Sequence, residues 1–146
     1  MARRTTFAPF ATRKRARKMA DIKKCTPAMR AGRLSKANQF LTAAELIAAS
    51  IEDSDLADAF VTLCVHAGIA AADVICCAKL NEHSTGGNHK IAVAFLARVD
   101  PSNSVHLATL LGMKGHAGYS AVPSTAKYQE SARTAAQALV KAAKLA

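Results

Sequence analysis

The chain has 146 residues, of which 51% are hydrophobic, so it is long enough for one buried core and too short for two full domains. It has no tryptophan and only 5% aromatic residues, a composition typical of close-packed helices rather than of sheets. The formal net charge is +10. Composition therefore predicts a basic, all-α domain without strands.

The excess positive charge is concentrated at the start of the chain. Residues 1–33 hold eleven Lys and Arg against one acidic residue, Asp21, which accounts for the whole net charge of +10. Residues 1–27 also lack apolar periodicity, as is typical of a solvated arm. The most basic run of this arm contains Arg13, Lys14, Arg15, Arg17 and Lys18. We therefore predict a basic, disordered arm over residues 1–27 and a helical bundle over residues 28–146.

Five helices are expected in the bundle, because apolar residues recur there at steps of three and four. The expected ranges are 28–50, 55–82, 89–98, a fourth helix from about residue 104, and 124–146. The fourth helix has no clear end, since three glycines weaken it from Gly112 onward. Their lengths favour a compact bundle over a solenoid.

The second of these helices is apolar on most of its circumference, which predicts a central position in the bundle. Gly68 within it indicates close packing against a neighbour. Asp53 or Ser54 is expected to cap this helix, and Ser124 is expected to cap the last one. The turn between the second and third helices is predicted at residues 84–88, where two glycines occur.

The cysteines and the apolar second helix indicate in which cellular compartment the protein resides. The four cysteines are Cys25, Cys64, Cys76 and Cys77. No apolar leader follows Met1, so we expect reduced thiols, three of them packed as small hydrophobes in the second helix. That helix is interrupted by His66, Asp73 and Lys79, which argues against a membrane span. We therefore expect a cytoplasmic protein that does not associate with membranes.

The segment 114–119 combines a lysine, two glycines, a histidine and a tyrosine at the end of an apolar helix. One interpretation is a patch that faces a phosphate, in which Lys114 supplies charge while His116 and Tyr119 supply donors or a stacking face. The other interpretation is a plain helix end with a glycine stop.

His66 and Asp73 are seven residues apart and therefore share one face of the second helix. They are candidates for the same cleft as Lys114, with His66 as base or donor and Asp73 orienting the lysine. Alternatively, they are polar groups that tie helices together. His83 and His89 flank the glycine turn, but no spacing typical of a zinc site occurs, so neither a metal nor a cofactor is expected.

A resemblance to a known family is carried by the run 58–77, His89, the pair Leu110-Leu111 leading to Lys114, and residues 117–120. Over about residues 33–143 the chain resembles actinobacterial-type HEPN domains. The resemblance implies a helical bundle associated with nucleotides or RNA, a homodimer, and a place in a toxin–antitoxin or phage-defence system, with a nucleotidyltransferase as a possible partner. Ribonucleolytic members carry an arginine followed, after four to six intervening residues, by a histidine. Lys114 and Tyr119 stand near these positions, and His116 does not restore the spacing.

Tyrosine, with a pKa of about 10, is a poor base at neutral pH, and lysine lacks the planar fork of arginine. We therefore predict a domain that binds RNA or a nucleotide without catalysis. The first alternative is a metal-independent endoribonuclease that uses Lys114, Tyr119 and His66. The second is a helical adaptor whose arm docks on an acidic protein. We predict that the arm contacts the phosphate backbone of a nucleic acid. The alternatives are a solubility tail, a targeting signal, or a segment that docks on an acidic protein.

Overall fold

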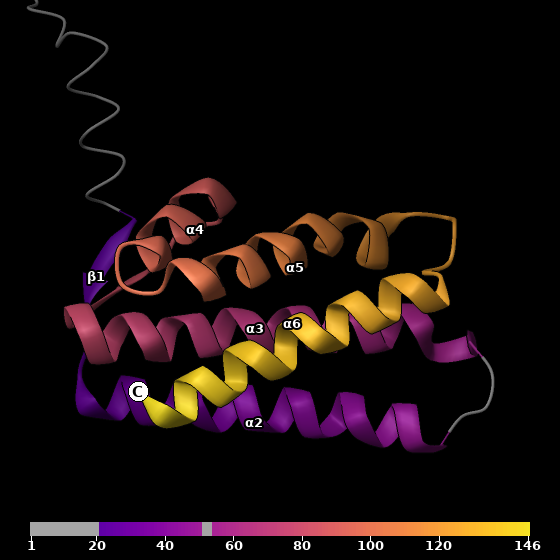
Figure 1. Ribbon diagram of the computed structural model, residues 1–146, viewed down its shortest axis with the longest axis horizontal. Coiled ribbons are helices and arrows are strands. Elements are labelled where there is room, and N and C mark those ends of the chain that lie inside the picture. The colour runs from indigo at the N-terminus through magenta and orange to yellow at the C-terminus, as the bar shows by residue number, and fades with distance from the viewer. Residues whose placement is uncertain (1–20, 51–53) are drawn as a thin grey trace, which may run out of the picture.

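A computed structural model of the chain describes residues 21–50 and 54–146, and its helices lie side by side along one long axis (Figure 1). In chain order the elements are β1 (Ile22–Lys24), α2 (Pro27–Ser50), the 3-10 turn η1 (Ser54–Leu56), α3 (Ala57–Leu80), β2 (Glu82–Ser84), α4 (His89–Ala97), α5 (Pro101–Tyr119) and α6 (Ala126–Leu145). The predicted bundle of five helices is confirmed for this part of the chain.

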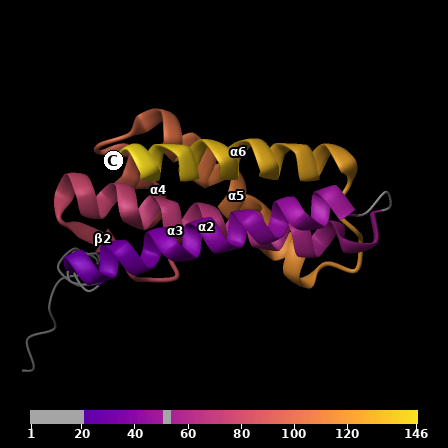
Figure 2. The ribbon, with the colours of Figure 1, turned by 90° about the horizontal axis from the view of Figure 1, so that it is seen from below.

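Helix α3 is the centre of the bundle, as its apolar circumference predicted. Figure 1 shows it between α2 and α5, and α6 crosses it on the near side. In the view turned by 90°, α6 runs above α2 as a separate layer (Figure 2). By length and composition α3 could cross a membrane, but 72% of its most apolar stretch is buried by the other helices. Its hydrophobicity is thus accounted for by its position in the core.

Gly68 allows α5 and α6 to close on α3. A Cβ atom at this position would overlap Leu110 Cδ1 of α5 and lie 3.2 Å from Leu139 Cδ1 of α6. Both leucines are fully buried. The close packing predicted at this glycine is therefore confirmed.

The prediction of no strands is wrong for the described residues. Strand β1 pairs with β2 in antiparallel register, with Ile22 opposite Ser84 and Lys24 opposite Glu82. Asn81 adopts a left-handed conformation with φ of 56°, which turns the chain out of α3 and into β2. Such short strands leave no alternating pattern in the sequence, because they are formed by a pairing between distant segments.

The sheet also changes the boundary of the predicted arm. Residues 22–24 form β1, and α2 already begins at Pro27, so these residues belong to the bundle. The remaining basic candidates of the arm lie outside the described residues; they are Arg13, Lys14, Arg15, Arg17 and Lys18.

A disulfide joins Cys25, just after β1, to Cys77 in the last turn of α3, with their Cα atoms 5.5 Å apart. The expectation of reduced thiols is therefore wrong for this pair. The sequence did not reveal the bond because the two residues are 52 positions apart and meet only when β1 pairs with β2. Cys64 and Cys76 are free and buried, as expected.

Three helix ends differ from the predicted ones. Helix α5 starts at Pro101, because the Asp100 side chain accepts a bond from Asn103 N at 3.1 Å and caps it. Helix α6 is capped by Thr125, whose side chain accepts from Tyr128 N at 3.2 Å. Helix α3 begins after Leu56 without a side-chain cap. Of the two expected caps, Ser54 starts the turn η1 instead, and Asp53 lies outside the described residues.

Ser124 does not cap α6 and instead ties the α5–α6 loop to α3. Its backbone N and its Oγ both donate to Asp58 Oδ1, at 3.0 and 2.6 Å. These bonds lower the pKa of Asp58, and the nearby His116 adds to the effect. The loop is thereby fixed to the first turn of the central helix.

Candidate functional site

A pocket of about 150 Å³ lies where α3, α5 and the start of α4 meet. We call it the α3–α5 pocket. Its apolar lining is provided by Ile69, Ala72, Ala92, Leu107 and Leu111. Its polar and charged lining is provided by Asp73, Ser84, Asn88, His89 and Lys114, and two glycines and Cys76 complete it. Charged and helix-terminal groups therefore converge around an apolar floor, as in many ligand sites.

One wall of the pocket is the glycine turn that leads into α4. Asn88 caps this helix, and its Oδ1 accepts a bond from Ile91 N at 3.2 Å. Gly86 lies against Asp21, because a Cβ at this glycine would overlap the Asp21 carboxylate. Gly87 has no such neighbour within 4 Å. Backbone N–H groups at the start of a helix attract anions, so this wall offers hydrogen-bond donors, although the Asp21 carboxylate beside Gly86 adds a negative charge to it.

Lys114 of α5 provides a positive charge on the pocket, and its side chain is exposed. It thus adds a mobile ammonium group to the fixed N–H groups of the glycine turn. The ammonium group favours a phosphate as a point charge, and the backbone N–H groups favour it as hydrogen-bond donors.

Asp73 lies in the pocket but does not orient Lys114 as predicted. Its Oδ2 accepts a bond from Arg33 Nε at 2.8 Å, and the two side chains are 15% and 26% exposed. Burial raises the pKa of Asp73, and the guanidinium of Arg33 opposes this rise. The correction has a simple cause: Arg33 comes from α2, forty residues upstream, and reaches α3 across the helix interface.

His66 stands beside the pocket rather than in its lining. Its ring packs against Phe40 of α2 at 5.4 Å between centroids, and its side chain is exposed. Partial burial lowers the pKa of His66, and the charges of Lys114 and Arg33 lower it further. The lowered pKa favours the neutral imidazole at pH 7.

The predicted patch over residues 114–119 is divided by the helix that carries it. Residues two positions apart point about 200° away from each other on an α-helix, so His116 and Lys114 face different sides. His116 makes an edge-on contact with Tyr128 of α6 at 5.3 Å. Tyr119 is 88% exposed at the end of α5. Of this segment, only Lys114 lines the pocket.

Thiol chemistry is not available in the pocket. Cys76 lines it, but burial raises the pKa of this thiol to about 12, and the charge of Asp73 contributes to the rise. The thiolate, which is the nucleophilic form, is thus absent at neutral pH. Among residues 21–50 and 54–146, no three His, Cys, Asp or Glu side chains are grouped to hold a metal.

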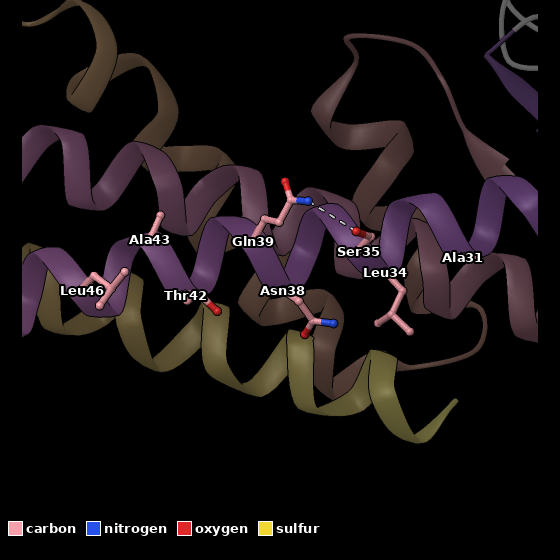
Figure 3. Close-up of a pocket in the computed structure, with 8 residues that line it drawn as sticks. All are labelled: Ala31, Leu34, Ser35, Asn38, Gln39, Thr42, Ala43 and Leu46. Carbon is pink, nitrogen blue, oxygen red and sulfur yellow. Dashed lines mark hydrogen bonds between the residues drawn. The ribbon is translucent and has the colours of Figure 1, made fainter.

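A larger hollow of about 720 Å³ lies on the outer face of α2 (Figure 3). All of its lining side chains come from this one helix and none is charged; they are Ala31, Leu34, Ser35, Asn38, Gln39, Thr42, Ala43 and Leu46. Its polar groups partly satisfy each other, since Gln39 Nε2 donates to Ser35 Oγ at 3.5 Å. This open face offers no converging charges, so the α3–α5 pocket is the better candidate.

Comparison of the chain with known protein families, with curated proteins and with solved structures gives no match. The functional argument therefore rests on the chemistry of the pocket. Sequence reasoning placed Lys114 and Asp73 at one cleft. It missed the hydrogen bond of Asp73 with Arg33 and the position of the glycine turn in the lining of the pocket. The turn did carry a signal, because two glycines and an asparagine directly before a helix are a typical anion site.

Proposed function

We propose that the chain is a HEPN-like domain that binds a phosphate group of RNA or of a nucleotide in the α3–α5 pocket without cleaving it. The observation that carries the proposal is the convergence of Lys114 and the N-terminal turn of α4 on one small pocket with an apolar floor. Both groups favour a negative charge, and they come from different helices held by the same core.

The size of the pocket defines which part of the ligand enters it. Pockets for whole drug-sized ligands measure roughly 300–1,000 Å³. At about 150 Å³, the α3–α5 pocket takes one phosphoryl group or the edge of one base. The rest of the nucleotide or strand then lies outside the pocket. The basic residues 1–20, which are not among the described residues, are further candidates for contacts to phosphates.

Asp73 does not oppose this ligand, because its charge is compensated by Arg33 at 2.8 Å. Arg33 and Lys114 offset the carboxylates of Asp73 and of Asp21, which packs on Gly86. We therefore attribute binding of the phosphate to Lys114 and the N–H groups of the turn and not to a net positive charge around the pocket. The Asp73 carboxylate can accept a hydrogen bond from a ribose hydroxyl, the group that distinguishes RNA from DNA. Asp73 thus favours a ribonucleotide over a free phosphate ion.

A titration of the isotope-labelled full chain with adenosine monophosphate, followed by NMR, tests the proposal. We expect the amide signals of Gly86, Gly87 and His89 to shift with saturation, whereas adenosine without its phosphate leaves them in place. Shifts confined to α2 or α6, or none at all, would contradict the proposed site.

The endoribonuclease remains a second candidate on one specific observation. Burial and the charge of Lys114 lower the pKa of His66, which favours the unprotonated imidazole that a general base needs. Against it stands the position of Tyr119, which is 88% exposed and does not line the pocket. Incubation with mixed RNA in EDTA decides between the two: cleavage by the wild type that is lost in both Lys114→Ala and His66→Ala would establish the enzyme.

The assembly and the biological setting remain predictions from the HEPN resemblance. They are a homodimer and a toxin–antitoxin or phage-defence role with a nucleotidyltransferase as partner. The cytoplasmic location is a separate prediction from the amino-acid sequence, and the Cys25–Cys77 disulfide does not support its premise of reduced thiols. The adaptor alternative, in which the basic segment docks on an acidic protein, makes a distinct prediction. It requires that the chain bind an acidic polypeptide such as polyglutamate more tightly than RNA of equal charge.

A further inference from the structure

We infer that the Cys25–Cys77 disulfide is a redox switch for the α3–α5 pocket. In its oxidised form the bond anchors β1 to α3, and β1 in turn holds the glycine turn that forms one wall of the pocket; reduction releases that wall. The effect on ligand binding rests on the proposed function, whereas the effect on the wall does not.

The disulfide anchors β1 to the central helix. Cys25 directly follows β1, and Cys77 lies in the last turn of α3. Cys25 N also donates to Asn81 O at 2.9 Å, immediately before β2 begins. The covalent bond and this hydrogen bond together fix one end of the sheet to the bundle core.

The sheet in turn holds the wall of the pocket. β1 pairs with β2 residue by residue, and Thr85 N donates to Asp21 O at 2.7 Å beyond the end of the ladder. Asp21 then packs on Gly86, which lines the pocket. A chain of direct contacts therefore runs from the disulfide through β1 to the glycine turn.

Apart from its backbone hydrogen bonds and the contact of Ile22 with the core, little else within the described residues stabilises β1. Its three residues bury only part of Ile22, while Lys23 and Lys24 are exposed. Two-stranded sheets are marginal in water, and segments with few buried apolar contacts open locally at low free-energy cost. Once the disulfide is broken, β1 and the turn packed on it should therefore open far more often than the helices do.

The sulfur atoms suit exchange with a dithiol carrier. Cys25 is partly exposed, so a reductant can reach its sulfur atom. Cys77 is only 5% exposed, and its Sγ is covered by Met29, whose Sδ lies 3.6 Å away. A thiolate of the reductant attacks Cys25 Sγ, and Cys77 leaves as a thiolate that takes up a proton. The second thiol of the reductant then attacks the mixed disulfide, Cys25 is released as a thiol, and the carrier leaves as a disulfide. Two electrons and two protons pass to the protein, and the reverse reaction restores the bond.

The cellular setting determines whether this bond is permanent or switchable. Disulfides persist in oxidising compartments and are reduced in the cytoplasm. For a cytoplasmic protein, as we propose, the reduced form is the resting state and oxidation tightens the pocket. This direction follows from the position of the bond, because only the oxidised chain has β1 covalently attached to α3.

Amide hydrogen exchange of the full chain, with and without dithiothreitol, tests the inference. We expect reduction to speed exchange of the Thr85 amide by about tenfold or more, while amides in the interior of α3 are unchanged. The affinity for a labelled single-stranded RNA should fall by about fivefold in parallel, by loss of the preorganised wall. Unchanged exchange at Thr85 would overturn the switch.

Cys25→Ser is the matched variant, because it removes the bond while leaving the buried Cys77 in place. Its Thr85 amide should exchange quickly in both buffers, and dithiothreitol should have no further effect. A variant that still responds to the reductant would overturn the inference, since the effect would then have another source. If this variant fails to fold, the comparison of oxidised and reduced wild type still decides.

Gly86→Ala and Gly87→Ala test the contact without any redox change. The first should displace Asp21 and mimic reduction at Thr85, whereas the second has no neighbour within 4 Å and should not. Equal exchange in both would overturn the route through Asp21. If Thr85 responds to reduction but RNA binds in neither redox state, the switch stands and the proposed function fails.

Discussion

Substitution of Gly68 by alanine tests how closely α5 and α6 pack on α3. In an open helix this change would stabilise the fold by up to about 1 kcal/mol, because alanine is the better helix former. At this position the new methyl group would overlap Leu110 and press on Leu139, both of which are fully buried. Overpacking of a core costs about 1–3 kcal/mol. We therefore expect a net loss of about 1 kcal/mol in the free energy of unfolding.

Urea unfolding followed by circular dichroism at 222 nm measures this change, with Gly112→Ala as the matched control. Gly112 also lies inside a helix, but no atom comes within 4 Å of the position its Cβ would take. The control should gain up to about 1 kcal/mol. If both variants were stabilised equally, α5 and α6 would not close on Gly68, and the described packing would be wrong.

Two further predictions concern titrating groups. Lys114→Ala should raise the pKa of His66 toward its ordinary value of 6.5, because a positive charge that disfavours the imidazolium is removed. NMR titration of the imidazole measures this pKa, and Lys127→Ala, which removes a charge of α6 that does not act on His66, should leave it unchanged. Ser124→Ala should raise the pKa of Asp58, because it removes the hydrogen bond from the Ser124 hydroxyl, while the bond from the backbone N–H of residue 124 remains. Since these bonds lower the folded-state pKa, their stabilisation is present above the ordinary pKa of 3.8 and is lost as the pH falls through the lower folded value. The stability difference between wild type and this variant should therefore shrink below about pH 4, and a difference that grows in acid would contradict the assignment.

The features that were predicted correctly depend on local sequence. Apolar residues at helical spacing revealed all five helices within the described residues, and the all-round apolarity of α3 revealed the core. Gly68 carried a packing signal for the same reason, since an interior glycine weakens a helix unless a neighbour needs the space. In each case the regular geometry of the helix places residues three or four positions apart on one face, so the sequence pattern alone shows which face is buried.

The features that were missed depend on contacts between distant segments. The Cys25–Cys77 bond and the pairing of β1 with β2 span more than fifty residues, and no local pattern encodes them. The ion pair of Asp73 with Arg33 spans forty. Conversely, Lys114 and His116 are close in sequence but lie on different faces of α5, so sequence proximity suggested a patch that the helix divides.

The most direct test of the account is the salt dependence of RNA binding by the wild type, Lys114→Ala and the exposed control Lys127→Ala. Fluorescence anisotropy with a labelled single-stranded RNA between 50 and 200 mM salt gives the slope of log affinity against log salt. Each phosphate neutralised on a single strand contributes about 0.7 to this slope. The account predicts that Lys114→Ala binds more weakly with a slope smaller by about 0.7, while Lys127→Ala matches the wild type. Equal affinity and slope for Lys114→Ala and the wild type would contradict phosphate binding in the α3–α5 pocket.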